Sequence, residues 1–208
     1  MKRTKPVKKM LAALSVLLLL LFCTACGRQT SGDPNNEFVF GEDGYAFGPT
    51  PYGSTPEEVE TAIGCEMVDL GENPVTEPFE YSSYTTPQAT VKLAGLTSRV
   101  DAQFTEDDGL FAITYNSSIT PDQRERFLEL YRKHYVSLFG EPTEESTADT
   151  GWTTLLWEDA ESGTVFAIQV DGRAADEEYD ERTYAVALGA FEKWRYVEAG
   201  VGEWAGEG

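Results

Sequence analysis

The sequence predicts an α+β fold made of two related helix-then-antiparallel-sheet units, with the helices packed on the sheet. The same helix-start signal occurs at Thr55 and again at Thr120, and each occurrence is followed by runs in which apolar and polar residues alternate. The composition supports an ordinary hydrophobic core, because the 208 residues include eleven Phe, ten Tyr and four Trp.

The first helix is expected to begin at Pro56 and to end at Gly64. Thr55 is suited to the N-cap, Pro56 needs no hydrogen-bond donor at the first helical position, and Glu58 completes a capping box. Gly64 readily adopts the left-handed conformation in which many helices end. This helix is therefore short.

The second helix repeats the device in Thr120-Pro121-Asp122-Gln123 and is expected to run to Phe139, stopping at Gly140. Its apolar residues recur at spacings of three and four, which predicts one buried stripe. The stripe consists of Phe127, Leu128, Tyr131, Tyr135 and Leu138.

Strands are expected between and after the helices, and a small hairpin before them. The hairpin would turn at Glu42-Asp43-Gly44, and a longer one at Asp107-Asp108-Gly109. Before the second turn, Ser98, Val100, Ala102 and Phe104 should face one way, with Arg99, Asp101 and Gln103 facing the other. The remaining strands are expected at 91–93, 111–115, 152–157, 164–170 and 183–191.

The N-terminus has the layout of an export signal that ends at a lipid-attachment cysteine. Five basic residues precede an apolar run from Met10 to Phe22, and the small residues Thr24 and Ala25 come before Cys26. This resembles the bacterial lipobox, although Cys23 stands where Leu is usual. We expect cleavage between Ala25 and Cys26 and diacylation of Cys26.

An uncleaved anchor helix and plain secretion are the alternatives. The apolar run from Met10 to Ala25 is shorter than the roughly 20 residues that span a bilayer, which favours the cleaved form. The chain then divides into a signal peptide (1–25), a lipidated tether (26–37), a first α+β unit (38–119), a second α+β unit (120–198) and a flexible tail (199–208).

The mature chain would be strongly acidic. Removing residues 1–25 leaves 11 basic against 36 acidic residues, a net charge of −25. Such a surface repels phosphate backbones and anionic headgroups, so nucleic acid is excluded as a partner. Cys65 would be the only thiol left, and we expect it to be a small buried hydrophobe rather than a nucleophile.

Two stretches resemble a known group of envelope proteins. They are Tyr52 to Gly64, and Val100 to Phe104 with Asp107-Asp108-Gly109-Leu110, Ile113 and Tyr115. They are similar to the modules of the outer-membrane assembly lipoprotein BamE and of the β-lactamase inhibitor protein. A diverged second module would include Leu138 to Pro142, Trp152, Trp157 and Gly163-Thr164-Val165, so the resemblance covers roughly residues 47–191. It implies an α+β fold and binding rather than catalysis, without specifying a partner.

Candidate catalytic residues are few. The sole histidine, His134, falls on or beside the apolar stripe of the second helix, which favours a packing role. Neither Glu106-Asp107-Asp108 nor the acidic loop 171–181 has the spacing of a calcium loop, and whether they bind calcium is left open. Trp152 and Trp157 are five positions apart, so in an unbroken strand they should point to opposite faces.

These observations favour a lipid-anchored binding or interaction protein on the extracytoplasmic face of the membrane, with an envelope protein or a glycan as partner. No enzyme activity, cofactor or metal is expected. The alternative is a small carboxylate-dependent hydrolase acting on cell-wall or polysaccharide substrates, because the chain is rich in acidic residues.

Overall fold

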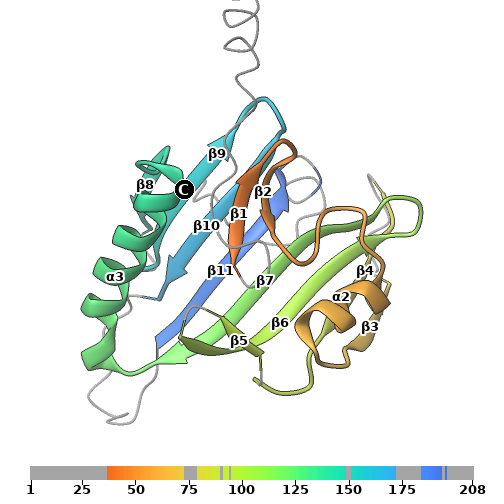
Figure 1. Ribbon diagram of the computed structural model, residues 1–208. Helices are drawn as coiled ribbons and strands as arrows, with labels where there is room; N and C mark the ends of the chain where they lie inside the picture. Colours follow the sequence, from red (N-terminus) through yellow and green to blue (C-terminus); the bar gives the residue numbers. More distant parts are fainter. Residues whose placement is uncertain are drawn as a thin grey trace, which may run out of the picture.

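The computed structural model (Figure 1) describes residues 37–72, 79–89, 91–93, 95–148, 151–171, 184–193 and 195. The predicted signal peptide, the cleavage site at Ala25 and Cys26, most of the tether and the tail 199–208 lie outside these residues. Within the described part, no helix is long and apolar enough to cross a membrane.

The described residues form one continuous antiparallel sheet of nine strands and a separate two-stranded hairpin. Eight strands of the large sheet follow the order β3-β4-β6-β7-β11-β10-β9-β8, and β5 pairs with β6 off this path. The strands are β3 (Val68–Glu72), β4 (Ser82–Thr85), β5 (Val91–Leu93), β6 (Leu96–Thr105), β7 (Gly109–Ile119), β8 (Glu144–Thr147), β9 (Thr153–Asp159), β10 (Thr164–Val170) and β11 (Tyr184–Glu192).

The sheet has two faces, which we call inner and outer. On β6 the residues Val100, Ala102 and Phe104 point to the inner face and belong to the main core, as the alternation in the sequence predicts. Arg99, Asp101 and Gln103 point to the outer face. The turn at Asp107-Asp108-Gly109 is confirmed, because β6 and β7 pair directly across it.

Three elements lie against the inner face (Figure 1): the hairpin of β1 (Phe38–Gly41) and β2 (Gly44–Phe47), helix α2 (Pro56–Ile63) and helix α3 (Pro121–Phe139). The hairpin covers the middle of the sheet. Phe38 packs against Phe166 and Tyr115, with ring centroids 4.8 and 5.8 Å away. Gly44 (φ +86°) lies so close to β10 that an added Cβ would collide with Thr164 and Ser162.

The helix boundaries agree with the predictions. The Thr55 hydroxyl accepts a hydrogen bond from the backbone N–H of Glu58, and the Glu58 carboxylate accepts one from Thr55 N–H. Gly64 has the left-handed conformation (φ 68°, ψ 28°). On α3 the predicted stripe is confirmed, because Phe127 and Tyr135 are buried and Leu128, Tyr131 and Leu138 are partly buried against the same core.

The predicted fold class is wrong. The structure is mostly one antiparallel sheet of nine strands with two helices among its described residues, and not a pair of helix-then-sheet units, because the single sheet runs through both predicted units. The predicted unit boundary at 119/120 falls between β7 and α3, yet β7 pairs with β11 over eight residue pairs. A hairpin, and not a helix, covers the centre of the inner face. The sequence pattern favours helices, because each helix cap is formed by residues close together in the chain. The pairing of strands about 70 residues apart leaves no such local pattern.

Candidate functional site

A row of side chains crosses the outer face of β3, β4, β6 and β7. The register pairs Val68 with Thr85, Thr85 with Asp101, and Asp101 with Thr114. Because neighbouring strands lie about 4.8 Å apart, Val68 and the Asp101 carboxylate lie roughly 10 Å apart along this row. We call this region the open half of the outer face. It consists of Val68, Thr85, Arg99, Asp101, Asn116 and Ser118, together with Leu70, which follows Val68 on the edge strand β3.

Asp101 is held in place from three sides. Asn116 donates a hydrogen bond to its Oδ2 at 2.6 Å, the Arg99 guanidinium lies 3.3 Å from the same oxygen, and the Thr85 hydroxyl donates to Oδ1. The Arg99 side chain is 54% exposed and that of Asp101 23% exposed. A carboxylate has about four acceptor sites, so Asp101 has capacity for one more donor. The network fixes a negative charge at the surface before any ligand binds.

Two aliphatic side chains lie beside this network without a cover. Val68 is 47% exposed and Leu70, two residues further along β3, is 63% exposed. Of the described residues, only Leu130 on α3 joins them as a large exposed hydrophobic side chain. Exposed aliphatic residues next to an ordered polar network are typical of surfaces that bind other proteins.

The edge of β3, in contrast to its outer face, is blocked. The Met67 N–H donates to the Glu60 carboxylate at 2.7 Å, and the Gly71 N–H donates to the Asp69 carboxylate at 2.7 Å. The pairing with β4 also shifts register between Asp69 and Glu72. Occupied N–H groups and a bulge are devices that keep an edge strand from pairing with another chain. A partner would therefore meet the face of the sheet and not its edge.

The electrostatic potential at this end of the sheet is negative. Helix α2 carries Glu57, Glu58 and Glu60, and β3 carries Asp69. Burial raises the pKa of Tyr84 on the adjacent strand, and the charges of Asp69 and Glu57 raise it further. The open half thus combines two exposed aliphatic side chains with polar groups, in a region of negative electrostatic potential.

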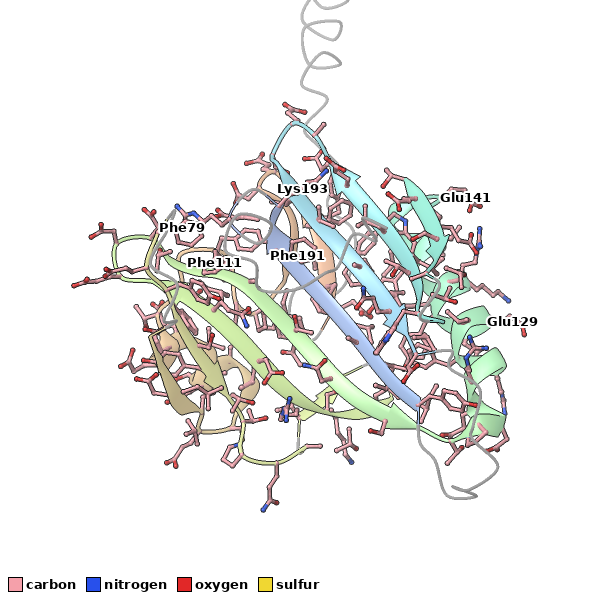
Figure 2. All side chains as sticks on the ribbon, turned by 180° about the vertical axis from the view of Figure 1, so that it is seen from behind. Phe79, Phe111, Glu129, Glu141, Phe191 and Lys193 are labelled. Atoms are coloured by element: carbon pink, nitrogen blue, oxygen red, sulfur yellow. The ribbon has the colours of Figure 1, made fainter. Side chains whose placement is uncertain are left out.

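The other part of the outer face is apolar and buried, and we call it the apolar half. Phe111 packs edge-to-face against Phe79 and Tyr81, with ring centroids 5.7 Å away in both cases. Figure 2 shows Phe79 and Phe111 near each other on this face, with Phe191 further along. The members are Phe79, Tyr81, Phe111, Ala112, Leu156, Val165, Ala167, Ala187 and Phe191.

His134 lies beside the core and is not buried in it. Its side chain is 44% exposed, and its Nε2 is 2.9 Å from Glu37 Oε2. The other carboxylate oxygen of Glu37 accepts a hydrogen bond from the Tyr135 hydroxyl at 2.8 Å. Glu37 is the last residue of the predicted tether, so these contacts fix the start of the folded domain to α3. The sequence pattern could not reveal Glu37, which lies 97 residues from His134.

The remaining predicted residues lie apart from one another. Cys65 is partly buried against the main core, and its Sγ lies 3.5 Å from the Glu66 carbonyl oxygen. Trp157 is buried on the inner face and donates from Nε1 to the Gly140 carbonyl at 2.8 Å, whereas Trp152 is only partly buried and precedes β9. Asp108, in the acidic turn, pairs with Arg195. Among the described residues, no group of three or more His, Cys, Asp or Glu could hold a metal ion.

Sequence reasoning missed the open half because its members come from four strands. The alternation on β6 placed Arg99 and Asp101 on one face, which was the available signal. Nothing in the sequence of Val68 to Leu70 indicates that β3 lies two strands away from Asp101.

No protein-family model matches the chain, and neither a curated protein nor a solved structure matches it significantly. The resemblance to BamE and to the β-lactamase inhibitor protein therefore stays a prediction.

Proposed function

We propose that this chain is a lipid-anchored, extracytoplasmic protein of the bacterial envelope that binds a protein partner with the open half of its outer face. The observation that carries the proposal is the row from Val68 through Thr85 to Asp101. It combines exposed aliphatic side chains with a pre-positioned carboxylate on a face that the hairpin, α2 and α3 leave free. Pre-positioned polar groups lose little entropy on binding, and aliphatic burial supplies affinity.

The partner is expected to be a protein with a cationic, partly apolar surface. Sugars stack on exposed aromatic rings, but the exposed hydrophobic residues of the open half are aliphatic. A Lys or Arg from the partner could donate to Asp101, and the acidic residues of α2 and β3 would attract it over distances up to about 8–10 Å at physiological salt. These features favour the envelope protein over the glycan as the partner.

The location rests on the basic start, the apolar run and Thr24-Ala25-Cys26. Intact-mass analysis of the membrane fraction should show loss of residues 1–25 and addition of a lipid at Cys26. Cys26→Ser should release the protein from the membrane fraction. An unprocessed N-terminus, or unchanged membrane retention of this variant, would remove the anchor from the proposal without affecting the binding surface.

The binding surface can be tested in cells with a photo-crosslinking amino acid in place of Leu70. The same substitution at Leu130 is the matched control, since both side chains are exposed and their elements, β3 and α3, lie at opposite edges of the sheet (Figure 1). We expect one specific protein adduct at position 70 that is absent at position 130. The purified partner should then bind Leu70→Ala at least tenfold more weakly than Leu130→Ala. Equal affinities for the two variants would show that the adduct is accidental and would contradict the proposed surface.

A further inference from the structure

We propose that the exposed side of helix α3 docks on the anionic lipid headgroups of the membrane that carries the anchor. This inference rests on the proposed lipid anchor at Cys26 and not on the proposed binding surface, so the docking and the binding surface can fail separately. It adds an orientation to the proposed function, because a domain that rests on α3 turns its open half away from the bilayer.

The first observation is that basic residues gather on α3. Four of the 11 basic residues expected in the mature chain lie between positions 121 and 139, against only three of its 36 acidic residues. Helix α2, in contrast, has three Glu and no basic residue. In a chain that is otherwise strongly acidic, α3 therefore carries an excess of positive charge. Clustered Lys and Arg side chains are attracted to anionic headgroups.

The second observation is that two outward cations of α3 are unpaired. Arg126 and Lys133 are exposed, and within the described residues their side chains form no hydrogen bond or ion pair. Arg132 instead pairs with Glu141 and Glu145, which offsets these two carboxylates beside the helix. Arg126 and Lys133 can therefore meet lipid phosphates without giving up a contact in the protein.

The third observation is that Leu130 lies between these two cations. Its side chain is 50% exposed, and spacings of four and three residues place it with Arg126 and Lys133 on one side of the helix. Ser137 continues this side and is also exposed. We call these four residues the α3 row. An aliphatic side chain flanked by basic residues suits the boundary between headgroups and acyl chains.

The fourth observation is where the predicted tether joins the domain. The carboxylate of Glu37, the first described residue, is 2.9 Å from His134 Nε2 and 2.8 Å from the Tyr135 hydroxyl. His134 is about one helical turn from Leu130, so the tether meets the domain beside the α3 row. Glu37 lies eleven residues after Cys26, and that length of chain reaches at most about 40 Å. The anchor thus keeps the α3 row within reach of the bilayer.

The acidic charge of the whole domain opposes this docking only in part. Salt screens charges beyond about 8–10 Å at physiological ionic strength, so an approaching bilayer responds mainly to the nearest side chains. The acidic elements α2 and β3 lie at the opposite edge of the sheet from α3 (Figure 1). A lipid chain and a basic surface bind more firmly together than either does alone, because the anchor raises the effective concentration of the α3 row at the membrane.

Fluorescence quenching on vesicles tests the docking. The lipidated protein, with Cys65→Ser and Ser137→Cys, is labelled with a fluorophore and inserted into preformed vesicles of phosphatidylcholine alone or of equal parts phosphatidylcholine and phosphatidylglycerol. A neutral aqueous quencher should act at least threefold more weakly on the anionic vesicles. The matched control carries the label at Thr61→Cys, an exposed position of α2, and its quenching should differ less than 1.5-fold. Equal quenching at position 137 on the two kinds of vesicle would overturn the proposal.

Charge variants identify the cause of the protection. Arg126→Gln together with Lys133→Gln should abolish it, whereas Lys92→Gln together with Lys193→Gln removes the same two charges elsewhere and should preserve it. Protection that survives the loss of Arg126 and Lys133 would show that another copy of the protein, and not the bilayer charge, covers the row, and would overturn the proposal. An intact mass without the lipid would overturn the anchor and the docking together. A lipidated chain without protection would overturn the docking alone.

Discussion

The two faces of the sheet are built from the same strands but differ in what they bury and how. The inner face is filled by large rings, with Phe38, Tyr115, Tyr135, Trp157 and Phe166 all at most 1% exposed. Among the described residues, the outer face carries mainly small and polar side chains, and its aromatic rings gather at the apolar half. One face therefore consists of a closed core, and the other divides into a buried half and an open half.

This difference shows that alternation alone does not assign roles to a sheet. On β6, the outward side chains are polar at Arg99 and Asp101, while on β10 both faces are apolar. A strand that is apolar on both sides must be covered twice. We therefore expect substitutions on the inner face to change stability, and substitutions in the open half to change binding.

The largest effect is expected on the inner face at Phe127. This ring is 4% exposed and stacks on Tyr131 with centroids 4.0 Å apart. Phe127→Ala should lower the free energy of unfolding by about 3–5 kcal/mol, because it leaves a cavity in the core. Leu130→Ala on the same helix is the control and should cost less than about 0.5 kcal/mol, since Leu130 is 50% exposed. Denaturant melts measure both values, and similar losses would contradict the assignment of the core.

The second-largest effect is expected from alkaline pH, which should lower the stability of the fold through tyrosines buried on the inner face. Burial, and then the charge of Glu37, raise the pKa of Tyr131 to about 12, while burial raises the pKa values of Tyr115 and Tyr135 as well. An unfolded tyrosine titrates near pH 10, so the folded state holds these protons more tightly. Their contribution to stability is complete below pH 10 and is lost as the pH rises through the folded pKa values.

Denaturant melts at intervals from pH 9 to 12 should therefore show a falling free energy of unfolding. In Tyr131→Phe the decline should be shallower, because one of the titrating groups is absent. If the free energy of unfolding declined with pH equally in Tyr131→Phe and in the parent chain, Tyr131 would have the same pKa in the folded and unfolded states, which would contradict the prediction.

A smaller effect is expected where Glu37 meets α3. Tyr135→Phe removes the hydroxyl that donates to Glu37 and should cost about 1–2 kcal/mol, because the carboxylate is 14% exposed and loses one of its donors. His134→Gln should cost less than about 1 kcal/mol, since this contact is half exposed and Gln can still donate. Thermal melts of the two variants at pH 7 measure both losses of stability. A larger loss for His134→Gln would reverse the assigned order of the two contacts.

The smallest effect is expected at the surface pair of Lys193 and Glu158. Their side chains are 46% and 32% exposed, so Lys193→Met should cost about 0–1 kcal/mol, and less at high salt. Chemical denaturation in urea at 0.05 and 0.5 M NaCl measures this dependence. A loss that does not change with salt would indicate that the Lys193 stem contributes by packing.

The sequence predicted local features well and the assembly poorly. Helix caps at Thr55 and Thr120, the turn at Gly109 and the stripe on α3 all depend on residues within about ten positions of one another. The joining of β7 to β11 depends on residues about 70 positions apart, and β-rich pairing of that kind leaves no periodic signal. The prediction of two helix-covered units failed for that reason.

The candidate site was predicted only in part. The alternation on β6 identified Arg99 and Asp101 as outward residues, but their partners Thr85 and Asn116 could not be found from spacing. Val68 and Leu70 lie outside the predicted strands, and their exposure depends on which strand lies at the edge of the sheet. His134 was placed correctly beside the stripe, while Glu37, its contact, depends on the path of the N-terminal hairpin.

The separation of roles is tested most directly at two neighbouring residues of β6, Val100 and Asp101. Val100 is 0% exposed on the inner face, and Asp101 lies on the open half. The free energy of unfolding and the affinity for the crosslinked partner should be measured for Val100→Ala and Asp101→Ala. We expect Val100→Ala to lose about 2 kcal/mol of stability with unchanged affinity, and Asp101→Ala to lose at least tenfold in affinity with a stability loss of about 1 kcal/mol or less. Parallel losses of stability and affinity in both variants would contradict the account.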